Sequence, residues 1–528
     1  MALLCTTASI FAQEAYQLQS SADYDRQVVR VKFKEEQARV LDELMKGEDQ
    51  LTPRGSLLHT GIAGFDAASV ETGATGMKRV FRNGGKFEAR HRQWGLHLWY
   101  EVTIGQGQDL QAALNTYHEV AEVEIAEPHG VYRLVDDMGV DMMREKPMMA
   151  ASAATNSMVI PGGTPNDPGY NQQWGFPAID AAQAWELETG HTSVVVAIED
   201  QGVDYNHPDL AGNMWTNTDE IPNNGVDDDN NGYVDDYYGY NFGNDNGNIA
   251  IDFHGTHVGG TVAAETNNGV GVAGTAGGSG NNDGVRLMSL STFGNGAQGG
   301  FDEAFIYAAD NGAAISQNSW GGGAQSAALE NAIDYFIANG GGGVMDGGLV
   351  VFAAGNDNSS NPNIGYPASY SPCIAVANLQ QNLSRWTTSN YGSWVDIAAP
   401  GRSIYSTYPL SQGSYASITG TSMACPHVSG VAALVVSDRV RNGQSITDTE
   451  LRIILEGTTV SVDAQNPSYI GLLGTGLVNA YQALTGTVAP PPPCYGSGSA
   501  ISSFPYSESF ESGTGAWQQT TCDDIDWT

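Results

Sequence analysis

The sequence predicts an α/β domain built as a three-layer sandwich with a central parallel β-sheet, preceded by a small α+β domain. Two features of residues 165–485 predict the sandwich: apolar stretches of strand length, and helical segments that alternate with them. The strand candidates are Ser193–Ile198, Leu349–Ala354 and Cys373–Ala377, and the helix candidates are Asp302–Asn311, Ala327–Asn339 and Met423–Val440. Strands that are apolar on both faces are typical of a parallel sheet covered by helices on both sides.

Residues 24–135 predict the smaller domain, in which strands and helices also alternate. Its predicted elements are a strand at Val28–Phe33, a helix at Glu35–Lys46, a strand at Leu96–Ile104, a helix at Leu110–His118 and a strand at Val120–Ile125. Residues 136–164 are rich in Met, Ala, Ser and Gly and show little periodicity. Such a composition indicates an exposed linker that a protease can cut.

The two ends of the chain predict segments outside these domains. Residues 1–13 are small and apolar, like the end of a secretory signal peptide, although the usual basic residues do not precede them. Residues 486–505 form a Pro-, Gly- and Ser-rich linker with a stiff run at Pro490–Pro493, and residues 506–528 are too few to build a core. No stretch of about 18 apolar residues occurs elsewhere, so we expect a secreted protein without a transmembrane helix.

The composition excludes some classes of partner. The chain has 59 Asp and Glu against 22 Lys and Arg, a formal net charge of −37. This argues against nucleic acid or an anionic membrane surface, because both require a positive surface. The acidic excess either serves solubility or ligates calcium. Five cysteines are too few for a disulfide scaffold: Cys373 and Cys425 lie in apolar contexts that favour buried thiols, whereas Cys494 and Cys522 could form a bridge.

Three short motifs in the large block carry the parts of a nucleophilic triad. Asp200 ends a buried strand within Val194–Leu210, and His254 begins a helix within Asp252–Ala264. Ser422 lies at the mouth of another helix within Gly420–Gly430. In such a triad the serine attacks, the histidine takes its proton, and the aspartate fixes the imidazole tautomer and stabilises its cation. The carboxyl ends of parallel strands meet at one edge of the sheet, so these residues are expected to converge.

Acyl transfer also requires hydrogen-bond donors for an oxyanion and a place for the substrate chain. The backbone N–H of Ser422 is one donor, and the side chain of Asn356, directly after a buried strand and a Gly turn, is the other candidate. The run Ser319-Trp320-Gly321-Gly322 follows the predicted strand Ala314–Asn318. A peptide can add there as an extended strand through main-chain hydrogen bonds.

These motifs, in the order Asp, His, Ser, resemble the subtilisin-like serine proteases (subtilases), and the resemblance covers Pro165–Thr485. It implies a subtilisin-like fold and a secreted serine endopeptidase that hydrolyses peptide bonds through an acyl-enzyme. It also implies that Asp200, His254 and Ser422 form the triad and that Asn356 lies in the oxyanion hole. The walls of the specificity pocket are then Ser319, Trp320, Gly321, Ala353, Ala354 and Gly355. A degenerate member that only binds is the alternative reading. An esterase is disfavoured because the Gly-x-Ser-x-Gly elbow is missing.

Two further resemblances concern the flanks. Tyr100–Ile104 and Ala121–Pro128 resemble the last part of a subtilase propeptide, which implies that residues 24–135 assist folding and inhibit the enzyme. Self-cleavage is then expected between Leu134 and Pro165, in a monomer whose partners are protein or peptide substrates and its own propeptide. Residues 506–528 resemble the start of a MAM-type β-sandwich, on Phe510-Glu511, Trp517 and Asp523–Trp527.

The run from Asp227 to Asp236 predicts a calcium (Ca²⁺) site, because oxygen-bearing side chains alternate around Gly232. The expected ligands are Asp227, Asp229, Asn231, the backbone carbonyl of Tyr233, and Asp235. The twelfth position of this EF-hand-like spacing is Tyr238 rather than Glu, so another group must complete the shell, and a merely solvated acidic turn is the alternative. Resemblance to thermitase-like subtilases implies a second calcium site, with ligands Asp167, Asp209 and Asn268.

Three residues invite competing interpretations. His257 follows His254 by one helical turn and is predicted to be a packed structural residue. Trp320 either caps the core or lines the substrate cleft. Glu199 stands before Asp200 where the family usually has an apolar residue, and Gln201 follows where it usually has Thr or Ser. Because side chains alternate along a strand, Glu199 should face away from His254 and requires either a buried partner or a raised pKa.

Overall fold

The computed structural model describes residues 16–19, 23–46, 49–51, 58–135, 164–294 and 296–486. The chain divides into two units, Met1–Leu484 and Thr485–Thr528. Several sequence predictions lie outside the described residues. These are the signal peptide, nearly all of the linker 136–164, the Pro-rich run, the Cys494–Cys522 bridge and the MAM-like segment.

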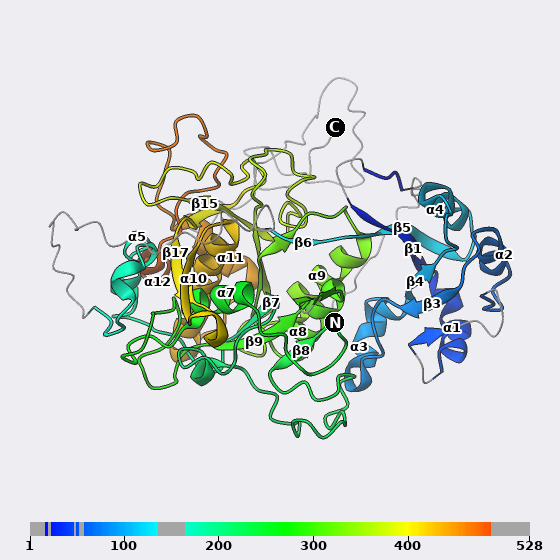
Figure 1. The fold of residues 1–528 in the computed structure, drawn as a ribbon, viewed down its shortest axis with the longest axis horizontal. Helices are drawn as coiled ribbons and strands as arrows, with labels where there is room; N and C mark the ends of the chain where they lie inside the picture. The colour runs from blue at the N-terminus through cyan, green and yellow to red at the C-terminus, as the bar shows by residue number, and fades with distance from the viewer. Residues whose placement is uncertain are drawn as a thin grey trace, which may run out of the picture. The chain divides into compact units, whose positions relative to one another are not determined.

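The N-terminal domain is a five-stranded antiparallel sheet with helices (Figure 1). The strand order is β2-β3-β4-β1-β5. The strands are β1 (Tyr24–Phe33), β2 (Gln50–Leu51), β3 (Gly76–Arg79), β4 (Trp99–Thr103) and β5 (Val123–Gly130), and the helices are α1 (Ala38–Leu44), α2 (Ala63–Glu71), α3 (Glu88–Gln93) and α4 (Leu110–His118). Its core contains Phe33, Phe65, Tyr100 and Tyr117, all fully buried.

Two predicted strands of this domain differ from the observed ones. Leu96–Leu98 is a turn of 3₁₀ helix, so β4 begins only at Trp99. The last strand begins at Val123, because Val120 closes a turn by accepting the Val123 N–H at 3.0 Å, and it continues to Gly130.

The large domain is a three-layer α/β sandwich, as the sequence predicts. Its seven strands are all parallel, in the order β16-β15-β14-β12-β7-β9-β8. They are β7 (Val195–Asp200), β8 (Gly239–Asn241), β9 (Arg286–Ser291), β12 (Ile315–Asn318), β14 (Leu349–Ala353), β15 (Ile374–Leu379) and β16 (Ile397–Pro400). The main helices are α7 (Phe253–Ala263), α8 (Phe301–Asp310), α9 (Ala327–Asn339) and α10 (Thr421–Arg441).

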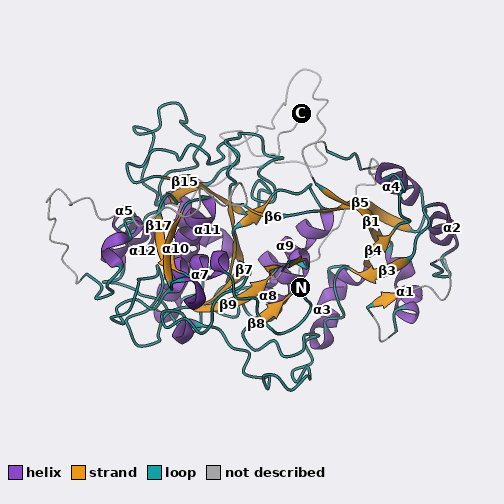
Figure 2. Cartoon of the chain, viewed as in Figure 1, coloured by secondary structure: helices purple, strands orange, loops and turns teal. Residues whose placement is uncertain are grey.

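Helices cover both faces of this sheet (Figure 2), and a separate hydrophobic core lies on each face. Val196 and Ile198 of β7 pack in a cluster with residues of α7 and α10, whereas Val195 and Ala197 pack in a second cluster with residues of α8 and α9. The alternation of apolar residues on β7 therefore fills both layers.

Shorter elements complete the described chain. They are β6 (Arg133–Leu134), β10 (Phe293–Gly294), β11 (Ala297–Gln298), β13 (Trp320–Gly321), β17 (Ile404–Thr407), β18 (Tyr415–Ile418), α5 (Gly175–Ala178), α6 (Ala181–Ala184), α11 (Asp448–Gly457) and α12 (Ala480–Thr485). Among them, β6 and β13 matter for the site, because they pair with each other although they come from different domains. Cys373 and Cys425 are buried free thiols, as predicted.

Candidate active site and cation sites

Asp200 and His254 form a buried hydrogen-bonded pair. Asp200 is the last residue of β7, and His254 is the second residue of α7, a helix capped by the Asp252 side chain. The His254 Nδ1 atom lies 2.8 Å from both carboxylate oxygens of Asp200. Gln201, the unusual neighbour of Asp200, accepts the backbone N–H of His254 at 3.3 Å. It therefore helps to position the start of α7.

Ser422 is the second residue of α10 and is fully buried. Its hydroxyl donates to the carbonyl of Ser319 at 3.2 Å, and the Ser319 hydroxyl donates back to the carbonyl of Ser422 at 2.9 Å. Asn356 lies just beyond β14 and accepts the Thr421 N–H through Oδ1 at 3.1 Å. Asp200 and His254 thus form one buried pair, and Asn356 contacts the start of helix α10 next to Ser422.

The end of the N-terminal domain lies along the residues predicted to bind substrate. Strand β6 pairs antiparallel with β13, with Leu134 opposite Trp320 and Arg133 opposite Gly321. The Val135 N–H then donates to the carbonyl of Ser319 at 3.4 Å. The Asn356 amide Nδ2 donates to the carbonyl of Val135 at 3.1 Å.

Two side chains of this segment, Val135 and Tyr132, pack against the larger domain. Val135 lines a pocket together with Gly321, Gly322, Ala353, Ala354 and Gly355. Tyr132 is fully buried, with its ring centroid 5.0 Å from that of Phe301 and 5.2 Å from that of Trp320. The Trp320 indole packs in the core with Phe301 and Phe352, the first of its two predicted roles, and its backbone pairs with β6.

Glu199 is buried without a hydrogen-bond partner for either carboxylate oxygen among the described residues. It stands opposite Asn318 of β12 and Leu290 of β9, and strand alternation turns it toward the layer of α8 and α9. Burial raises the pKa of Glu199 well above its ordinary value, and the charges of Asp302 and Asp200 raise it further. Of the two alternatives from the sequence, the absence of a hydrogen-bond partner among the described residues favours the raised pKa.

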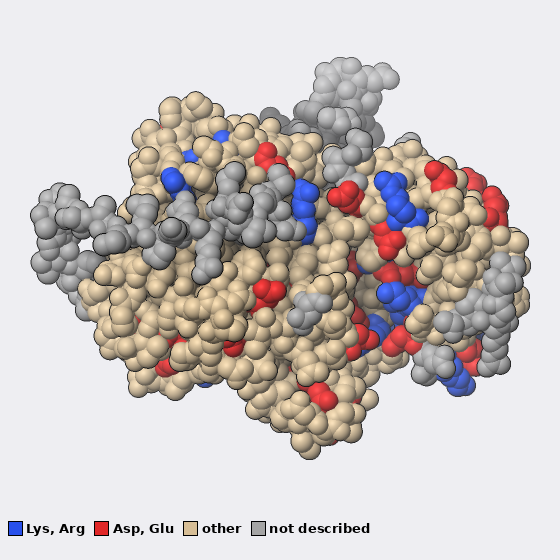
Figure 3. All heavy atoms as spheres, viewed as in Figure 1, with Lys and Arg blue, Asp and Glu red and all other residues tan. Residues whose placement is uncertain are grey.

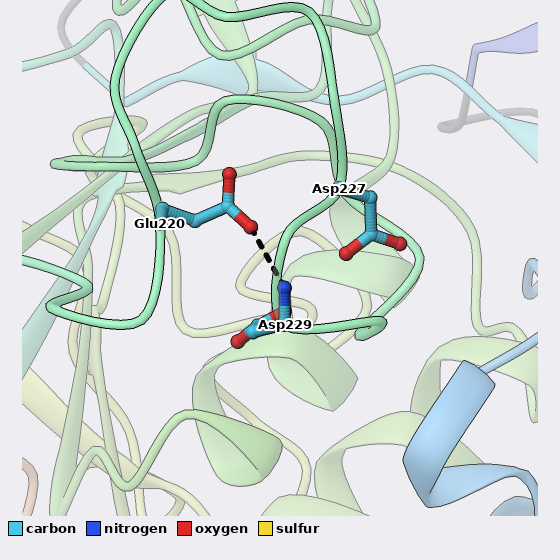
Figure 4. A group of neighbouring side chains, drawn as sticks. All are labelled: Glu220, Asp227 and Asp229. Carbon is cyan, nitrogen blue, oxygen red and sulfur yellow. Dashed lines mark hydrogen bonds between the residues drawn. The ribbon is translucent and has the colours of Figure 1, made fainter.

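The acidic loop gathers Asp227 and Asp229 with a residue that the sequence does not single out, Glu220 (Figure 4). One oxygen from each of the three carboxylates lies within 4.8 Å of the others. Glu220 Oε1 accepts the Asp229 N–H at 3.2 Å, while Glu220 Oε2 is buried and has no hydrogen-bond partner among the described residues. Glu220 precedes the loop without any spacing pattern, so no sequence signal identifies it.

The other predicted ligands of this loop make local hydrogen bonds. The Asn231 side-chain oxygen accepts the Tyr233 N–H at 2.8 Å. Asp235 accepts the backbone N–H groups of Asn224 and Gly225, at 2.8 and 3.0 Å.

The second predicted calcium site also brings its three residues together. Asp167 accepts the N–H groups of Asn267 and Asn268, and Asp209 accepts the Asn268 side-chain amide at 3.0 Å. Asp167 and Asp209 are both buried. Two buried carboxylates and an amide oxygen are donors that suit a hard cation such as calcium.

His257 is buried, and its Nε2 lies 2.9 Å from the carbonyl oxygen of Ile404, which fits a packed structural residue. Burial lowers the pKa of His257 to about 3, so it stays neutral. Among the described residues, no helix combines the length and the apolar composition needed to cross a membrane.

Residues 191–476, just over half of the chain, match the model of the subtilase family. The chain belongs to this family of serine endopeptidases. Thermitase of Thermoactinomyces vulgaris is 38% identical over 322 residues, which cover 61% of this chain and 99% of thermitase. A thermophilic serine proteinase of Bacillus sp. (strain AK1) is 36% identical, over 61% of this chain and 69% of the relative. An extracellular protease of Xanthomonas campestris pv. campestris is 35% identical, over 62% and 57%.

Among solved structures, fervidolysin from Fervidobacterium pennivorans, described as a keratinolytic enzyme related to subtilisin, has a TM-score of 0.58 at 23% identity. The similarity covers 90% of this chain and 63% of fervidolysin. It supports the fold of the subtilase domain.

Proposed function

We propose that Asp200, His254 and Ser422 are the catalytic triad of a self-processing serine endopeptidase. In this proposal His254 takes the proton of the Ser422 hydroxyl, and the Asp200 carboxylate holds the Nδ1–H tautomer and stabilises the imidazolium that forms. The Ser422 N–H and the Asn356 side-chain amide donate to the oxyanion of the tetrahedral intermediate.

One observation carries the proposal: the Asn356 amide donates to the carbonyl oxygen of Val135 at 3.1 Å. This is the contact expected between an oxyanion-hole donor and the carbonyl that a nucleophile attacks. The Val135 N–H is bound to Ser319, whose carbonyl also accepts the Ser422 hydroxyl. We therefore assign the bond Val135–Asp136 as the processing site, within the range that the sequence predicts.

The contacts of the N-terminal domain support its role as propeptide and inhibitor. Its last residues fill the groove beside Ser319–Gly321 that a substrate would need. Glu127 accepts the Ser326 hydroxyl and the Ala327 N–H, both at 2.7 Å, and so caps helix α9. Arg30 binds Asp302 of α8 through two hydrogen bonds, of 3.1 and 2.7 Å. After cleavage the domain would stay bound until these contacts break.

The same inserted segment indicates a substrate preference. The residue before the cleaved bond would be small and aliphatic, like Val135, because Gly and Ala residues line its pocket. The residue three positions earlier would be aromatic, like Tyr132 between Phe301 and Trp320.

We propose calcium at two sites, one at Glu220, Asp227 and Asp229 and one at Asp167, Asp209 and Asn268. The orphaned carboxylate oxygen of Glu220 supports the first, and the buried pair Asp167 and Asp209 supports the second. When bound, calcium would supply positive charge that crosslinks the loops; it takes no part in the chemistry. The extracellular relatives support secretion.

Intact-mass analysis after incubation with calcium tests the proposal. The parent protein should lose its N-terminal part and begin a new chain at Asp136, whereas Ser422→Ala should stay whole. Ser437→Ala is the matched control, because Ser437 lies in the same helix and its hydroxyl donates within that helix, to the Ala433 carbonyl at 2.7 Å. Persistence of the parent at full mass, or equal cleavage of Ser422→Ala, refutes the proposal.

A further inference from the structure

A basic segment of the N-terminal domain lies against the acidic loop of the subtilase domain. The Lys86 N–H donates to the carbonyl of Asn230 at 2.8 Å, and the Lys86 ammonium binds Asp229 Oδ2 at 2.8 Å. The Arg82 guanidinium donates to the carbonyl of Gly232 at 3.2 Å and lies 4.2 Å from the ring centroid of Tyr233. These contacts are separate from the substrate groove.

The Lys86 ammonium is bound to one of the three carboxylates that converge in the loop. Asp229 is shared between this ammonium and the cluster with Glu220 and Asp227 (Figure 4). The ammonium is a cation already present at the loop, so the carboxylates there do accept positive charge. Its side chain is 37% exposed, and solvent reaches the loop through a groove lined by Arg82, Gly232 and Asp235.

The carboxylates around Asp229 fit a divalent cation better than they fit the ammonium. Of the three carboxylates, the Lys86 ammonium binds that of Asp229, and Glu220 Oε2 stays buried and without a partner among the described residues. A calcium ion takes 6–8 oxygen ligands at about 2.3–2.6 Å, and so could satisfy Glu220 together with Asp227 and Asp229.

Charge is also distributed unequally between the two domains. Residues 165–485 contain six arginines and no lysine, whereas residues 24–135 contain 14 of the 22 basic residues of the chain. In Figure 3, blue side chains gather over the N-terminal domain, while the visible face of the larger domain shows few. Of these two domains, only the N-terminal one contains lysine, so it supplies the ammonium at the loop.

We propose that calcium and Lys86 compete for this loop, so that calcium binding loosens the N-terminal domain and docking of that domain weakens calcium binding. The inference rests on the calcium site proposed above. Linkage makes the two effects equal in size. A divalent ion and an ammonium about 5 Å apart in a water-like dielectric repel enough to change an affinity about tenfold. Calcium would thus promote release of the propeptide as well as stability.

Calcium titration calorimetry on full-length Ser422→Ala, which stays uncut, tests this directly. The calcium-binding step that is lost in Glu220→Gln is the one at the loop. Lys86→Gln should raise the calcium affinity of this step about tenfold. Lys86→Arg keeps the charge and should leave this affinity unchanged. Lys46→Gln removes the same charge from the same domain and should also leave the affinity unchanged, because the exposed Lys46 ammonium pairs with Glu43, three residues earlier in the chain, at 3.6 Å, and not with the loop.

Each outcome is decisive. If the calcium affinity of the loop is unchanged in Lys86→Gln, the proposed competition is wrong. If Lys46→Gln raises that affinity equally, the effect of Lys86 is only a general effect of charge. The absence of any transition that depends on Glu220 removes the calcium site itself. None of these results depends on proteolysis, so a failure here is distinguishable from a failure of the proposed triad.

Discussion

Replacing Arg30 by Met should weaken the binding of the cleaved N-terminal domain to the subtilase domain about 100-fold. Arg30 and Asp302 have side chains only 4% and 3% exposed, and they form a bidentate ion pair across the domain boundary. In the variant, Glu101 keeps the ammonium of Lys78 at 2.9 Å, whereas Asp302 has no second cation partner among the described residues.

The size of this effect follows from the burial. Removing one partner of a buried ion pair costs roughly 3–5 kcal/mol. The docked state bears this cost, because Asp302 is hydrated once the domain has left. About 3 kcal/mol corresponds to a factor of about 100 in the dissociation constant.

The assay measures peptidase activity after self-cleavage, as a function of dilution. Activity appears as the cut domain dissociates, and the protein concentration at half-maximal activity follows the dissociation constant. Lys32→Met is the control, because its ion pair with Glu124 is half-exposed and is worth about 0–1 kcal/mol. Asp302→Asn removes the same pair from the other domain, which keeps the test valid if Arg30→Met fails to fold. A shift below threefold in both variants, or an equal shift in Lys32→Met, refutes the reasoning.

Four other outcomes are expected. Because burial raises the pKa of Glu199, the folded state keeps a proton that the unfolded state releases above pH 4.5. The free energy of unfolding then falls by about 1.4 kcal/mol per pH unit from pH 4.5 up to the pKa of Glu199 in the folded state. Thermal midpoints measured from pH 5 to 8 should therefore fall less steeply with pH in Glu199→Gln than in the parent. An equal dependence on pH in both proteins would contradict this. Asn356→Leu should lower kcat by about 100- to 1,000-fold with little change in KM, the usual effect of losing one oxyanion donor in this class of enzyme; unchanged kcat would exclude its role. Adding calcium at about 100 times its Kd should stabilise Ser422→Ala by about 2.7 kcal/mol, an effect that a chelator reverses and that disappears if neither site binds. Peptides with Tyr at the position of Tyr132 should have a kcat/KM at least about tenfold above those with Gly, and a flat preference would remove the aromatic pocket from specificity.

The sequence predicts the elements that carry the proposed triad, because each member lies in a short contiguous motif. As predicted, Asp200 ends an apolar strand, and His254 and Ser422 lie at the starts of helices. The topology of parallel sheets then favours their convergence at one edge. The strand order, by contrast, depends on tertiary pairing that no local pattern contains.

Some of the elements that sequence reasoning misses are held by polar contacts. Helix α3 has no apolar face in its sequence, and its side chains are held instead by polar contacts, such as the hydrogen bond between His91 and Asp310 and the ion pair of Arg92 with Asp42. The same holds for Glu220, which reaches the acidic loop from outside it, and for Lys86, which comes from another domain. Hydrophobic periodicity carries no information about such contacts.

Labelling with a fluorophosphonate probe, followed by peptide mapping, tests the central claim most directly. After calcium incubation and release of the N-terminal domain, the label should be found on Ser422 and should be lost in His254→Ala, whereas Ser437→Ala should label like the parent. A label on another serine, undiminished labelling in His254→Ala, or no label at all once the N-terminal domain has been removed would contradict the proposed triad.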